Sequence, residues 1–64
     1  MGEILLKYYQ FVGDKRGIEG KLKLAQSTRM PSSVAAMQPD SSENVELFRK
    51  AVKDITGQDP GNLA

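Results

Sequence analysis

The side chains of this chain that could do chemistry are its serines, carboxylates and lysines, because its 64 residues include no Cys and no His. Without those two, the chain has no thiolate nucleophile, no thiolate zinc site and no side chain with an unperturbed pKa near neutrality. A nucleophilic serine would need a lysine or a carboxylate as its base. Ser32 and Ser33 directly follow Pro31, where serines commonly form caps and turns, so we expect no catalytic serine.

The acids and glycines also lack the patterns of known sites. Glu43 and Glu46 lie one helical turn apart at the start of an amphipathic segment, which is typical of a solvated helix start rather than an acid–base pair. The acids do not have the spacing of a calcium loop. Gly13, Gly17 and Gly20 lack the strand-to-helix context and the Lys-Ser/Thr pair of a phosphate-binding loop. The sequence therefore predicts no enzyme, no metal site and no cofactor.

One segment, LAQSTRMPSSVAAM at residues 24–37, resembles a helix-turn-helix motif, with a turn near Arg29 and a short second helix. The resemblance implies weak nucleic-acid binding by the region 18–38, with phosphate contacts from five side chains: Lys21, Lys23, Arg29, Ser32 and Ser33. The usual turn glycine is replaced by Arg29, and the second helix carries no Arg, Lys or Asn to read a base edge. Nucleic-acid binding is therefore the alternative function.

The charges are balanced over the whole chain, with nine Lys and Arg against eight Asp and Glu. Six bases and three acids occur up to Met30, and three bases and five acids from Pro31 onward. Copies could associate head to tail, or the first half could face an anionic partner, but we prefer the interpretation of a solvated surface with scattered charges. The total gives no electrostatic argument for a nucleic acid or a membrane. No apolar run approaches the ~20 residues of a spanning helix, and no signal-peptide pattern is visible, so we expect no membrane partner and a cytoplasmic location.

The elements that would position these residues are clearest near the C-terminus. The apolar residues of segment 40–57 recur at spacings of three and four: Val45, Phe48, Ala51, Val52 and Ile55. Asp40 or Ser41 suits the N-cap, Glu43 has capping-box spacing from Asp40, and Gly57 suits the C-cap. The pattern predicts a helix here, followed by a flexible tail over residues 58–64.

The first segment, residues 3–12, is apolar at seven of its ten positions. As a helix it has an apolar face wider than one partner helix would cover, and as a strand it would need burial on both sides. Leu, Lys, Gln and Glu favour the helix, which we prefer, whereas the aromatic and β-branched residues favour a strand. The surplus apolar width predicts a protein interface formed by six residues: Leu5, Leu6, Tyr8, Tyr9, Phe11 and Val12.

Residues 13–17 predict a break, because two glycines flank three charged residues. Residues 18–24 alternate like a strand, but a helical row is also present, and we prefer a helix from residue 18 to 29; the row is Ile18, Leu22, Ala25 and Arg29. The strand interpretation would make residues 3–25 a β-hairpin. Pro31 and Pro39 limit the next segment to a short helix, with Pro31 as its first residue.

Together these patterns predict a mainly α fold, a single small domain of three to four helices over residues 1–57, with an N-terminal β-hairpin packed on a C-terminal helix as the alternative. A chain of this length buries only about 60% of its unfolded surface and often needs extra stabilisation. Since disulfides and thiolate zinc are excluded, we expect a second copy to supply it. The expected function is a non-enzymatic protein-interaction module that binds itself or another protein through the first helix, as a homodimer.

Overall fold

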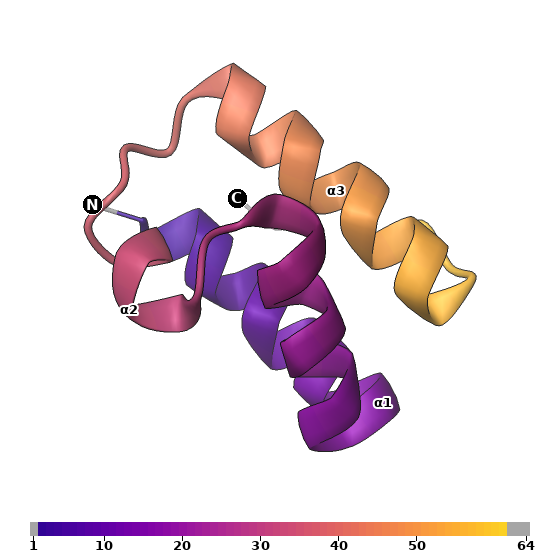
Figure 1. Ribbon diagram of the computed structural model, residues 1–64. Helices are drawn as coiled ribbons and strands as arrows, with labels where there is room; N and C mark the ends of the chain where they lie inside the picture. The colour runs from indigo at the N-terminus through magenta and orange to yellow at the C-terminus, as the bar shows by residue number, and fades with distance from the viewer. Residues whose placement is uncertain (1, 62–64) are drawn as a thin grey trace.

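The computed structural model describes residues 2–61, which form three helices: α1 (Glu3–Thr28), α2 (Ser32–Ala35) and α3 (Ser42–Thr56) (Figure 1). None of these described residues belongs to a β-strand. The mainly α fold is therefore confirmed, and the β-hairpin alternative is wrong. The strand-like alternation of residues 18–24 does not place the leucines on one face, because Leu24 is fully buried while Leu22 is largely exposed. Good helix formers and the helical row outweigh the alternation there.

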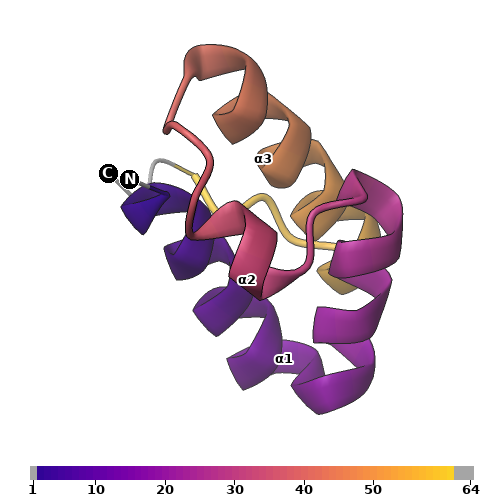
Figure 2. The same cartoon turned by 60° about the vertical axis from the view of Figure 1, so that its left-hand side comes forward.

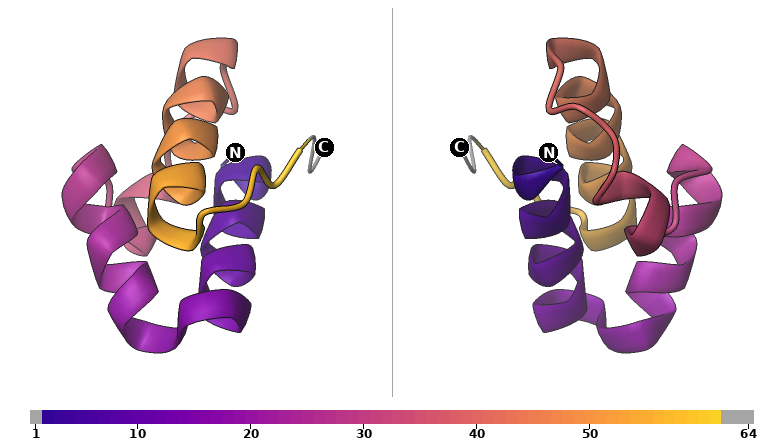
Figure 3. Two further views of the ribbon diagram at one scale, coloured as in Figure 1. Left: turned by 90° about the vertical axis from the view of Figure 1, so that its right-hand side faces the viewer. Right: turned by 90° about the vertical axis from the view of Figure 1, so that its left-hand side faces the viewer.

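Helix α1 is bent sharply at Gly17, whose φ of 67° and ψ of −153° are outside the helical region. We call residues 3–16 the first arm and residues 18–28 the second arm; Figure 3 shows them as the two limbs of a V. The break expected over residues 13–17 is therefore confined to one residue, because Gly13 and its three successors remain helical. Gly20 lets the arms approach closely, since a Cβ there would lie 2.7 Å from Cγ1 of Val12.

The two remaining helices lie on opposite faces of the V, as the two halves of Figure 3 show. Figure 2 shows α2 in front of the arms and α3 behind them. One apolar core joins all three helices, and it consists of Leu5, Tyr8, Tyr9, Val12, Leu24, Ala35, Phe48, Ala51 and Val52. The ring of Phe48 is at the centre of this core, with its centroid 6.4 Å from that of Tyr8 and 5.8 Å, edge-on, from that of Tyr9.

The predicted C-terminal helix is confirmed, with its caps. The Oγ of Ser41 accepts a hydrogen bond from the Asn44 amide at 3.2 Å, and Gly57, with a φ of 75°, donates its amide to the Lys53 carbonyl at 2.8 Å. Asp40 has a different partner, because its Oδ1 accepts from the Leu5 amide at 3.3 Å. Asp40 therefore satisfies a free amide in the first turn of α1 and is not the cap of α3.

The short second helix is confirmed as a single turn, but Pro31 is its N-cap rather than its first residue. After α3, the tail is tied back to the helix, since Arg49 donates from Nε and from its second terminal nitrogen to the two carboxylate oxygens of Asp59, each at 3.0 Å. Residues 62–64, which belong to the predicted flexible tail, lie outside the described residues. No helix within residues 2–61 has the length and apolar character needed to cross a membrane.

Candidate functional site

The first helix, which the sequence marks as the interface, lies at the centre of the fold. Four of its six predicted interface residues are buried inside the chain: Leu5, Tyr8, Tyr9 and Val12. Leu6 and Phe11 are half-buried, and the Lys15 ammonium lies 5.7 Å from the centroid of the Phe11 ring. The chain's own second arm, α2 and α3 thus cover the surplus apolar width. The expectation of a surface made by all six residues is corrected, since the core occupies most of them.

The largest exposed apolar side chains of α1 are instead on the second arm. Ile18 is 85% exposed and Leu22 is 58% exposed, and the two are four residues apart on one helix. Ala25, one turn further on, is half-buried against the core. This is the helical row that the sequence shows, and its first two residues, Ile18 and Leu22, face solvent. Leu24 is the fully buried apolar side chain of this arm. Apolar residues on two faces of one short helix are the sequence signal for an arm that has both a buried and an exposed apolar face.

The apolar residues of this row form one wall of a groove of about 290 Å³ between the second arm, the first arm and the start of α2. Seven residues line it: Tyr9, Ile18, Lys21, Leu22, Ala25, Pro31 and Ser32. Tyr9 is the buried member of the set, and its hydroxyl donates a hydrogen bond to the Met30 carbonyl, which fixes the turn before α2 against the first arm. Lys21 is the only charged residue in the lining. The groove is therefore apolar, with a single basic group.

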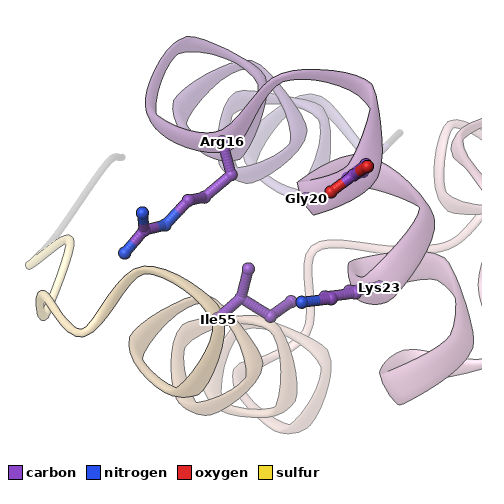
Figure 4. Close-up of a pocket in the computed structure, with 5 residues that line it drawn as sticks. Arg16, Gly20, Lys23 and Ile55 are labelled. Carbon is purple, nitrogen blue, oxygen red and sulfur yellow. The ribbon is translucent and has the colours of Figure 1, made fainter.

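A second cavity, of about 350 Å³, lies between α1 and the C-terminal end of α3 (Figure 4). Its lining is mixed in charge and consists of Arg16, Glu19, Gly20, Lys23 and Ile55. The Arg16 guanidinium donates to the Thr56 carbonyl at 3.4 Å and so satisfies a free carbonyl in the last turn of α3. Within residues 2–61, no three His, Cys, Asp or Glu side chains are grouped so that they could hold a metal ion.

The five residues proposed for nucleic-acid contact are divided between these places. Lys21 and Ser32 line the apolar groove, whereas Lys23 lines the other cavity. Arg29 is the C-cap of α1, and Ser33 is exposed in α2. Helix α2 has four residues and is about 6 Å long, much shorter than the recognition helix that lies in a major groove. The structure therefore brings only Lys21 and Ser32 to one cavity.

The displaced pKa values in the chain follow from packing and pairing. Burial raises the pKa of Tyr8 and of Tyr9 above 10, so both hydroxyls stay neutral at physiological pH. Hydrogen bonds from the Arg49 guanidinium and the Gly61 amide lower the pKa of Asp59 to about 2. Asp59 is paired at the surface, and the tyrosines belong to the core. The groups with shifted pKa values therefore do not form a pair of general acid and general base.

Searches against protein-family models, curated proteins and solved structures found no match to this chain.

Proposed function

We propose that the chain is a non-enzymatic protein-interaction module in the cytoplasm, and that it binds its partner at the apolar groove. We call this the second-arm surface, defined by the seven residues that line the groove. The observation that carries the proposal is the exposure of Ile18 and Leu22, which form part of the lining of an apolar groove. Burial of one such side chain is worth about 1.5–3 kcal/mol, so a partner that covers both gains a substantial free energy.

The core does not need these two side chains. Leu24 supplies the buried apolar contact of the second arm, and Tyr9 and Phe48 complete the packing against it without Ile18 or Leu22. Exposed apolar residues next to a groove are typical of surfaces that bind other proteins. Self-association, which the sequence suggests for the first helix, and binding of another protein are both forms of this function.

Site-specific photo-cross-linking in cells tests the proposal. A photoreactive amino acid replaces Leu22 in one variant and Ser27 in the other; Ser27 is exposed on the same arm but lies off the row. We expect the Leu22 variant to form discrete protein adducts and the Ser27 variant to form few. Substitution Ile18→Ser, one turn away, should reduce the yield of the Leu22 adducts at least fivefold. Equal adducts from both positions, or none from Leu22, would contradict the proposed function.

A further inference from the structure

We infer that the second-arm surface receives an amphipathic helix of another protein, with apolar residues four apart and acidic residues beside them. This inference rests on the proposed function and adds the chemistry of the partner.

The shape of the V supports a helical occupant. On one face, α3 packs between the arms through residues spaced three and four apart, including Phe48, Val52 and the half-buried Ile55. On the other face, α2 is a single turn, and its N-cap Pro31 and its first residue Ser32 line the groove. A helix from a partner would meet the row of residues 18, 22 and 25 with the same three- and four-residue spacing.

The charges beside the groove select an acidic partner. Lys21 is the one charged residue of the lining, and Arg29 ends the same arm. Within residues 2–61, neither base takes part in an ion pair, because the single pair found there joins Arg49 and Asp59. The acid of the second arm, Glu19, lines the other cavity. Carboxylates of a partner helix would therefore meet the uncompensated Lys21 in the groove lining, with Arg29 at the end of the same arm, which favours association and orients the helix.

Arg29, the base at the end of the second arm, has an unusual backbone conformation. Arg29 has a φ of 58°, a left-handed conformation that helix ends usually reserve for glycine. A residue with a side chain is strained in this conformation, because its Cβ approaches the following carbonyl oxygen. The exposed side chain of Arg29 adds a positive charge at the end of the second arm. A second copy related by a two-fold axis would bring Lys21 and Arg29 toward the same bases of its partner, and this repulsion disfavours the homodimer at this surface.

NMR titration of the ¹⁵N-labelled full chain with designed helical peptides tests the inference. One peptide has leucines four residues apart flanked by glutamates, the second has lysines in place of the glutamates, and the third has serines in place of the leucines. We expect only the first to shift the amides of Leu22, Ala25 and Ser32. Lys21→Glu should weaken its binding at least fivefold, whereas Lys23→Glu, at the other cavity, should change it less than twofold.

Several results would overturn the inference. The lysine peptide could bind as tightly as the glutamate peptide, or the glutamate peptide could produce no shift. Shifts at Leu22 that grow with protein concentration alone would identify a second copy as the occupant, and shifts with duplex DNA would identify a nucleic acid. If the peptides fail while cross-links from Leu22 persist, the helix inference falls and the proposed function stands; if both fail, both fall.

Discussion

The Tyr9 hydroxyl donates a hydrogen bond to the main-chain carbonyl of Met30, so the first arm of α1 holds the turn that follows the second arm. The same ring packs edge-on against Phe48 of α3, with 5.8 Å between the centroids. Tyr9 also lines the groove of the second-arm surface. A single side chain thus belongs both to the core and to the lining of the candidate binding site.

Tyr9→Phe should destabilise the fold by about 1 kcal/mol, because it removes the donor and leaves the Met30 carbonyl without this partner. Tyr8→Phe is the matched control, since Tyr8 is equally buried and its hydroxyl makes no hydrogen bond to any described residue. We expect the control to change stability by less than about 0.5 kcal/mol. Urea denaturation followed by circular dichroism measures both, and equal losses would contradict the role of the Tyr9 hydroxyl.

Substitutions at Leu22 and Leu24 should change the stability of the fold by very different amounts. Leu24 is fully buried, and Leu24→Ala should cost about 2–5 kcal/mol, comparable with the whole stability of so small a domain. Leu22 is 58% exposed, and Leu22→Ser should change stability by less than about 0.5 kcal/mol. The pair also distinguishes a helix from a strand, because residues two apart share one face of a strand. Thermal denaturation measures the stability of both variants. Equal destabilisation of the two would contradict the helical fold of this arm.

Local signals specified the C-terminal helix, whereas for residues 3–25 they favoured a helix and left a β-hairpin as the alternative. Helix α3 carries its apolar stripe and its C-cap glycine in its own sequence, whereas its N-cap was open between Asp40 and Ser41, because no local pattern shows that Asp40 accepts from the Leu5 amide. The turn at Gly17 could not be located within residues 13–17, because the conformational freedom of Gly13 and Gly17 is the same in an isolated chain. Packing decides between them, and Gly13 remains in the helix while Gly17 takes the positive φ.

The candidate site depended on contacts that no local pattern contains. The apolar width of the first helix was visible, but whether a second copy or the chain itself covers it depends on how the arms fold together. The close approach of Gly20 to Val12 brings the second arm onto the first, and this buries Tyr9 and Leu24 while Ile18 faces water. Three residues of the surface were found from the sequence for other reasons: Tyr9 as an interface residue, and Lys21 and Ser32 as nucleic-acid contacts.

The ion pair of the tail should respond to acid. Arg49 and the Gly61 amide lower the pKa of Asp59 to about 2, so the pair's contribution is present above the ordinary value of 3.8 and is lost as the pH falls toward 2. Arg49→Gln should bring the pKa of Asp59 back toward 3.8. Lys50→Gln, an exposed change at the next position of the helix, should leave it near 2. Carboxylate ¹³C shifts measured across this pH range follow the titration directly, and a pKa unmoved by Arg49→Gln would contradict the pairing.

A methyl group added at Gly17 or at Gly20 should destabilise the fold, but for different reasons. At Gly17 there is open space, so Gly17→Ala should cost about 1–3 kcal/mol through backbone strain alone. A D-alanine at position 17 of the synthetic chain accepts the positive φ and should instead stabilise the fold by about 0.4–1 kcal/mol.

At Gly20, the added carbon would lie 2.5 Å from Cβ of Arg16 and 2.7 Å from Cγ1 of Val12. Gly20→Ala should therefore destabilise by about 1–3 kcal/mol, although alanine normally stabilises the interior of a helix. Urea denaturation of Gly17→Ala, of the chain with D-alanine at position 17 and of Gly20→Ala measures whether each change stabilises or destabilises the fold. If Gly20→Ala were stabilising, the arms would not be in contact at this point, and the V that forms the groove would have a different shape.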